Sequence, residues 1–158
     1  ESDGRGGWCY TREENPHRPY GSMSAGGLAA LVLCDSLAGK DWRQDKAAKL
    51  GLDWVTYHYT PIENYGPVEE LMAKEMISDT PNMSTELYYY LWAVERAAAV
   101  CGLEKFGPRD WYAEAAHELL ASQRPDGSWS AGVKRCNPVY DTSFAILFLT
   151  RATASMKD

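Results

Sequence analysis

The sequence lacks the closely spaced cysteines and histidines that hold a metal ion. Its four cysteines, Cys9, Cys34, Cys101 and Cys136, lie far apart, and neither Cys-x-x-Cys nor His-x3-His occurs. We therefore expect no metal site and no cofactor. Cys34 and Cys101 lie in apolar stretches and are expected to be buried free thiols. A disulfide between Cys9 and Cys136 stays open, because its formation depends on compartment and geometry.

The chain also lacks a long hydrophobic run and any cluster of basic residues. Its longest apolar run, residues 25–34, is too short to span a bilayer. The formal net charge is −6 and Lys and Arg are scattered, which argues against a nucleic-acid partner, because phosphate backbones are normally bound by clustered basic side chains. No signal peptide is visible. Since the chain begins within the repeat described below, we expect its natural N-terminus to be missing, and localisation and oligomeric state stay open.

Aromatic residues with a polar group are unusually abundant. The 158 residues include six Trp and ten Tyr, with 45% hydrophobic and 24% charged residues. This balance is that of an ordinary globular protein, and the length suits a single domain covering residues 1–158. Tyr and Trp combine a large apolar face with one polar group, so they suit both a core and the lining of a cavity. Both alternatives stay open.

Periodicity predicts an all-α fold with two kinds of helix. Three helices are apolar on nearly all sides and are expected to be buried inner helices; they cover residues 22–38, 85–101 and 142–154. Two helices are amphipathic and are expected to lie outside them; they follow Asp41 and Asp110, which are predicted N-caps. Ser22 and Asp141 are the predicted N-caps of the first and last inner helices, and Gly102 is predicted to follow the end of the second.

Two further expectations concern how these helices pack. Gly26 and Gly27 interrupt the first inner helix, and the usual reason to keep glycine there is the close approach of another backbone. Residues 68–77 are predicted to form a short amphipathic helix across the mouth of the larger structure.

A short pattern recurs along the chain. Leu119 is followed by Gln123, Gly127 and Trp129, so that a helix end leads through a Pro-Asp-Gly turn to a tryptophan. The chain opens on the end of the same pattern. The residues that we expect to define the structural repeat are Gly7, Trp8, Gln123, Gly127 and Trp129. Asp-Trp pairs also recur at the start of both outer helices, and hairpins that recur in this way predict stacked αα units.

This pattern resembles the QW repeat of the terpenoid cyclase and protein prenyltransferase superfamily. The resemblance rests on Leu119-x3-Gln123-x3-Gly127-x-Trp129, followed by Asp141-Thr142-Ser143-Phe144-Ala145. Within the superfamily the chain is similar to bacterial proteins that carry a prenyltransferase/squalene oxidase repeat of undefined activity. The resemblance implies an α/α toroid. The chain would supply part of such a ring, about three inner and two outer helices, and would be a fragment of a larger protein.

The catalytic motifs of that superfamily are not matched. Squalene-type cyclases carry an Asp-x-Asp-Asp acid, whereas Asp79-Thr80-Pro81-Asn82 has one carboxylate. Prenyltransferases hold zinc through Asp-x-Cys and a distant His, whereas Asp141-Thr142-Ser143 has Ser in place of Cys, and a hydroxyl is a poor zinc ligand. We therefore lean towards a protein that is not an enzyme.

The leading hypothesis is a non-catalytic module that binds an apolar small molecule, a glycan or a protein segment. Its candidate ligand-binding residues are Tyr20, Glu86, Tyr88, Tyr89, Trp92, Tyr140 and Asp141. The alternative is an isoprenoid cyclase or transferase, or a carbohydrate-active enzyme, whose catalytic residues lie outside this chain. For the carbohydrate alternative, the aromatic side chains of residues 86–92 would form a wall with Glu86 and Glu95, since positions three and four apart share a helix face.

Overall fold

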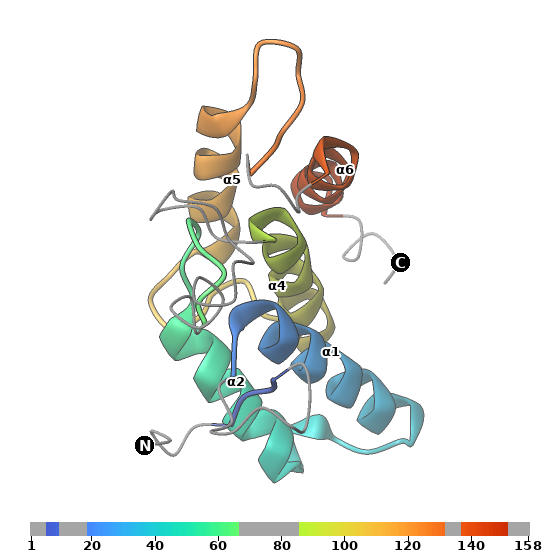
Figure 1. Ribbon diagram of the computed structural model, residues 1–158. Helices are drawn as coiled ribbons and strands as arrows, with labels where there is room; N and C mark the ends of the chain where they lie inside the picture. Colours follow the sequence, from blue (N-terminus) through green and yellow to red (C-terminus); the bar gives the residue numbers. More distant parts are fainter. Residues whose placement is uncertain (1–5, 10–18, 67–85, 132–136, 152–158) are drawn as a thin grey trace.

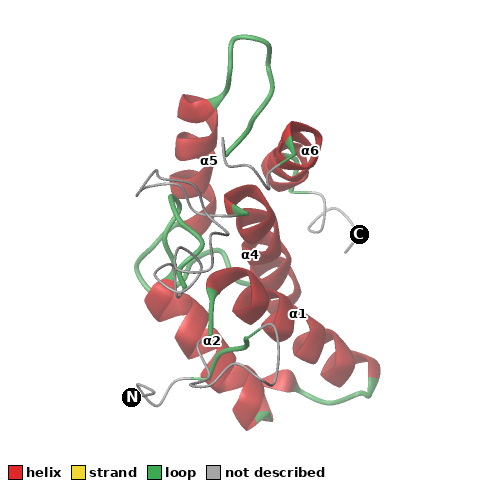
Figure 2. Ribbon diagram, viewed as in Figure 1, coloured by secondary structure: helices red, strands yellow, loops and turns green. Residues whose placement is uncertain are grey.

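The described part of the protein is entirely helical. The computed structural model describes residues 6–9, 19–66, 86–131 and 137–151, and within these ranges it contains helices and loops but no strand (Figure 2). The helices are α1 (Gly21–Leu37), α2 (Lys46–His58), α4 (Leu87–Cys101), α5 (Trp111–Ser122) and α6 (Pro138–Leu149), with a 3-10 turn, η1 (Trp42–Gln44). This confirms the predicted all-α class. The helix predicted over residues 68–77 lies outside the described residues.

Three helices form a row, and the other two lie along one side of it (Figure 1). α4 is central, with α1 packed on one flank and α6 on the other, and α2 packs against α1. α5 contacts α6 through the Tyr112 side chain, whose hydroxyl donates to the Leu149 carbonyl (2.8 Å). The row therefore has one side that faces α2 and α5 and one side that faces away from them.

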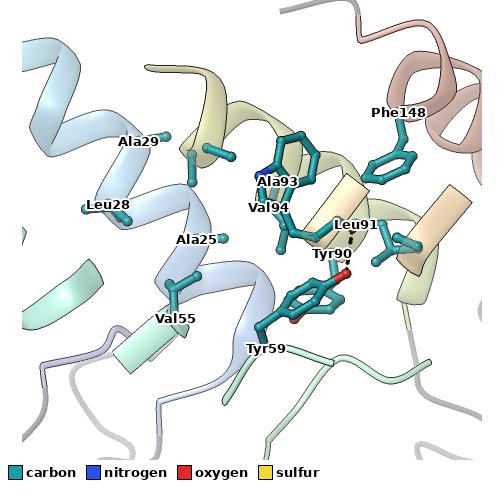
Figure 3. Close-up of a cluster of buried hydrophobic side chains, with 14 of the residues drawn as sticks. Ala25, Leu28, Ala29, Val55, Tyr59, Tyr90, Leu91, Ala93, Val94 and Phe148 are labelled. Atoms are coloured by element: carbon teal, nitrogen blue, oxygen red, sulfur yellow. Dashed lines mark hydrogen bonds between the residues drawn. The ribbon is translucent and has the colours of Figure 1, made fainter. Parts of the chain in front are cut away.

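Small residues let the row pack closely at its centre. Ala25 and Ala29 of α1 and Ala93 and Ala97 of α4 are all buried and belong to one core cluster, and Figure 3 shows Ala25 and Ala29 on the side of α1 that faces α4. Larger side chains surround this seam, and among them the Tyr59 hydroxyl donates to the Trp111 carbonyl (2.7 Å). Burial raises the pKa of the Tyr59 phenol, which therefore stays neutral at physiological pH.

Side-chain capping explains where most helices begin. The Asp45 carboxylate accepts from the backbone N–H groups of Ala47 and Ala48 at the start of α2. Asp110 accepts from Ala113 at the start of α5, as predicted. Asn137 caps α6, whose first residue is a proline, a residue suited to that position. At the end of α4, Gly102 has a φ of 71°, as its predicted position just past the helix requires.

Three predicted N-caps are wrong. Ser22 lies inside α1, where its backbone N–H donates to the Asn64 side chain (2.8 Å). Asp41 caps only the 3-10 turn η1, and Asp45 caps the helix that follows. Asp141 lies within α6, and its carboxylate accepts from the backbone N–H of Ala131 (2.9 Å). Ser22 and Asp141 are instead hydrogen-bonded to residues of other loops, Asn64 and Ala131. At α2 a residue closer to the helix, Asp45, is the N-cap.

The prediction that α1 is buried on nearly all sides is also wrong. Leu33 and Leu37 are 40% and 89% exposed, and Cys34 is exposed rather than buried. They lie on the side of α1 that no described helix covers. Cys101, by contrast, is buried as predicted. The disulfide left open between Cys9 and Cys136 is not described, because Cys136 lies outside the described residues.

The Trp8 side chain fills the space between α1 and α2. A Cβ atom on Gly27 of α1 or on Gly51 of α2 would lie 2.5 Å from the indole ring. Gly27 therefore does allow a close approach, but the neighbour is a ring and not the backbone that we had expected. At Gly26 no atom lies within 4 Å of the added Cβ, so this glycine has no such role.

Both tryptophans of the recurring pattern are held in the same way at the start of a row helix. The Trp8 backbone N–H donates to the Ser24 hydroxyl (3.0 Å), which donates back to the Trp8 carbonyl (3.5 Å). The Trp129 backbone N–H donates to the Thr142 hydroxyl (3.0 Å), which donates back to the Trp129 carbonyl (3.2 Å). We call this reciprocal pair of hydrogen bonds the Trp bracket.

The segment before Trp129 forms a tight turn. Its Gly127 N–H donates to the Arg124 carbonyl (2.9 Å), and the Gln123 side chain donates to the Gly127 carbonyl (3.0 Å). Gly127 has a φ of 83°, which favours glycine. The turn delivers the Trp129 indole into the core, where its N–H donates to the Leu119 carbonyl (2.8 Å). The spacing of Gln123, Gly127 and Trp129 in the sequence thus corresponds to a defined local structure.

Candidate binding face

Three aromatic rings meet where α4 and α6 lie side by side. The centroid distances are 5.8 Å between Tyr89 and Trp92, 5.3 Å between Tyr89 and Phe144, and 5.1 Å between Trp92 and Phe144. Tyr89 and Trp92 are three residues apart on α4, so they share one side of that helix. All three side chains are half-buried, and each therefore keeps apolar surface in contact with water. The cluster is a surface feature and not part of the closed core.

An arginine lies against this cluster. The Arg96 guanidinium carbon is 4.7 Å from the centroid of the Trp92 ring, at the distance of a cation–π contact. Arg96 follows Trp92 by four residues and continues the same side of α4. Within the described ranges Arg96 forms no hydrogen bond and no ion pair. Its N–H groups are therefore available to a partner.

The same surface continues along α6. Tyr140 precedes Phe144 by four residues and Leu147 follows it by three, so all three lie on one side of the helix. Tyr140 is 64% exposed and Leu147 36% exposed. We name this surface the aromatic face; its residues are Tyr89, Trp92, Arg96, Tyr140, Phe144 and Leu147.

The opposite side of α4 is buried. The aromatic and acidic residues that a carbohydrate-active enzyme would present on one surface therefore lie on two different sides of this helix. Tyr88 is buried, and Glu95 is 0% exposed. Neither carboxylate oxygen of Glu95 meets a hydrogen-bond partner in the part of the chain that the structure describes. Glu86 stands before the first turn of α4 with a φ of 64° and is exposed. Tyr89 and Trp92 therefore do not share a surface with Tyr88 and Glu95.

The remaining predicted site residues lie elsewhere. Tyr20 precedes α1, and its backbone N–H donates to the Trp8 carbonyl (3.2 Å). Asp141 is buried, and its carboxylate accepts from the backbone N–H of Ala131. Burial raises the pKa of the Asp141 carboxyl, and the hydrogen bond from Ala131 offsets part of this effect. Of the seven candidates, the structure brings Tyr89, Trp92 and Tyr140 onto the aromatic face.

Sequence reasoning missed half of this face. Arg96 directly follows Glu95 in the sequence, but neighbouring residues on a helix do not face each other, so this adjacency does not indicate that Arg96 lies over Trp92. Phe144 and Leu147 were assigned to a buried helix. The signal that could have found them is the spacing of four and three residues around Phe144, which matches the spacing from Tyr89 through Trp92 to Arg96.

The other candidate chemistries find no site in the described residues. No group of three or more His, Cys, Asp or Glu side chains that could hold a metal ion occurs there. His58 packs against Trp54 (4.4 Å) and Tyr65 (4.1 Å between ring centroids), as expected for a structural histidine. His117 is exposed and lies 3.6 Å from the Glu118 carboxylate.

Among the helices within residues 19–66, 86–131 and 137–151, none is both long and apolar enough to cross a bilayer. Comparison with known protein families, with curated proteins and with solved structures found no match to this chain.

Proposed function

We propose that the chain is a repeat domain of α/α-toroid type whose role is to bind a partner on the aromatic face, not to catalyse a reaction. The repeat is supported by the Trp bracket, which occurs at Trp8 and again at Trp129 with the same donors and acceptors. It is also supported by the resemblance of the Gln123, Gly127 and Trp129 spacing to the QW repeat of terpenoid cyclases and prenyltransferases. In this arrangement α1, α4 and α6 are the inner helices, and α2 and α5 the outer ones.

The observation that carries the binding role is the half-buried cluster of Tyr89, Trp92 and Phe144. Aromatic side chains contribute about 150–250 Å² each when they are fully covered, so a partner that covers these rings removes a large apolar area from water. Binding surfaces are enriched in aromatic residues and Arg and depleted in Lys, Glu and Asp. The aromatic face has this composition, since its six residues include four aromatic side chains, one Arg and no carboxylate.

The chemistry of the face supports binding more than catalysis. Its ionisable groups are the guanidinium of Arg96 and the phenols of Tyr89 and Tyr140. The six side chains can cover apolar surface and hold an anion. They supply no carboxylate, thiol or imidazole to a reaction.

Titration with bis-ANS, a fluorescent probe of exposed apolar surface, tests this proposal. The variant Trp92→Ala combined with Phe144→Ala should bind the dye about tenfold more weakly than the unchanged protein, because two of the covering rings are lost. Leu120→Ala on α5 is the matched control, since Leu120 is 62% exposed but lies off the aromatic face. Circular dichroism of each variant checks that the helices are retained. Equal dye binding by the double variant and the unchanged protein would refute the role of this face.

A further inference from the structure

We infer that the partner is an acidic, apolar protein segment, in which a carboxylate pairs with Arg96 while apolar side chains cover Trp92 and Phe144. This inference rests on the proposed function and specifies its partner. Its basis is the combination, on one face, of a guanidinium that lies over a tryptophan ring without a carboxylate partner among the described residues, and a set of exposed apolar side chains.

The stacking of Arg96 leaves its hydrogen-bonding edge open. A guanidinium that lies over an aromatic ring engages the ring with its flat face, and its N–H groups point outward in the plane of the group. That planar fork matches a carboxylate, which it binds through two parallel hydrogen bonds. Because Trp92 restricts the side chain in advance, less conformational freedom is lost when a carboxylate arrives.

Charge complementarity selects the sign of the partner. The chain carries a net charge of −6, yet the aromatic face holds a cation and no acid. Arg43 provides the contrast within the same molecule. It also lies 4.7 Å over a tryptophan, Trp42, but it has a carboxylate partner, since its guanidinium is 3.5 Å from Asp41. Arg43 thus has an ion pair with a carboxylate of its own chain, whereas Arg96 has no such ion pair among the described residues.

The shape of the face favours a protein segment over a small molecule. Small-ligand sites are concave and cover about 70–90% of the ligand surface, whereas Tyr140 projects from α6 with 64% of its surface exposed. The residues on α4 recur at i, i+3 and i+7, and those on α6 at i, i+4 and i+7. Each stripe is therefore about 10 Å long. A helix of two or three turns with one apolar side has the length and the spacing to lie along both stripes.

Selection of a phage-displayed library of random 12-residue peptides on the full chain provides the test. We expect the selected peptides to combine Asp or Glu with Leu, Phe or Trp. Fluorescence anisotropy then measures the Kd of the best peptide and of its acid-to-amide version. We expect the amide version to bind about tenfold more weakly, and Arg96→Gln to weaken the acidic peptide by the same factor without further weakening the amide version. Arg43→Gln is the matched control and should leave both Kd values unchanged.

The outcomes separate this inference from the proposed function. Selected peptides that are apolar but lack acids, with a Kd that Arg96→Gln does not alter, overturn the acidic partner and leave the binding face in place. Failure to select any peptide also overturns it, and binding of phosphatidylglycerol vesicles that Arg96→Gln abolishes would then assign the face to a lipid surface. Equal selection on the Trp92→Ala, Phe144→Ala double variant overturns the proposed function itself.

Discussion

Replacing Glu95 by methionine should make the protein more stable. Glu95 is 0% exposed and neither of its carboxylate oxygens has a hydrogen-bond partner in the described residues. A buried polar group without a partner costs about 1–3 kcal/mol, a cost that an apolar residue of similar volume does not incur. Methionine has nearly the same length and helix propensity as glutamate and fills irregular space. Allowing for imperfect packing, we expect a gain of about 1–2 kcal/mol.

Urea denaturation followed by far-UV circular dichroism measures this gain, and thermal unfolding should show a rise in Tm of about 3–6 °C. Glu95→Gln is a second variant, which keeps a polar group without a partner among the described residues at this position, and its gain should be smaller. Glu63→Met, at an exposed position, is the control and should change stability by less than about 0.5 kcal/mol. A loss of stability above about 1 kcal/mol in Glu95→Met would show that the carboxylate is satisfied in the folded protein and would refute the reasoning.

Three further predictions concern stability. Trp129→Ala should cost about 3–5 kcal/mol in urea denaturation, because it removes a buried ring; a change below about 1 kcal/mol would contradict the packing of the Trp129 indole in the core. Gly26→Ala should stabilise by about 0.5–1 kcal/mol, whereas Gly51→Ala should destabilise because its Cβ meets the Trp8 ring, and equal effects would contradict the packing described. Asp141→Asn should gain stability relative to the unchanged protein as pH rises. Because burial raises the pKa of Asp141 in the folded state, the unchanged protein loses stability as pH rises above about 4, the ordinary value. Urea midpoints at pH 3 and pH 7 measure the difference, and an equal difference at both would contradict it.

The sequence predicted a helix end correctly where residues close to it along the chain determine that end. Asp110 and Gly102 mark helix ends through backbone contacts within a few residues, so sequence spacing was sufficient. Asp141 was misassigned because its partner, Ala131, belongs to a preceding loop, and no local pattern reports that hydrogen bond. Cys34 was misassigned because hydrophobicity identifies an apolar helix but not which of its sides another helix covers.

The candidate site was predictable only in part, for a related reason. Tyr89 and Trp92 were found because aromatic abundance and helical spacing are visible in the sequence. Their neighbour Phe144 is more than fifty residues away, and only the packing of α4 against α6 brings it to them. The orientation of Arg96 over Trp92 likewise follows from the choice of rotamer, which the order of residues does not reveal.

The Trp bracket forms in the same way over loops of different length. The two brackets close over intervals of different length, since Trp8 and Ser24 are 16 residues apart and Trp129 and Thr142 are 13. In both, the hydrogen bonds join the tryptophan directly to the first turns of the next helix, so the contact between the tryptophan and that helix is the same at both lengths. Loop closure costs little more free energy for a few extra residues. A repeat of this kind can therefore differ in loop length by a few residues and still place its tryptophan against the next helix in the same way.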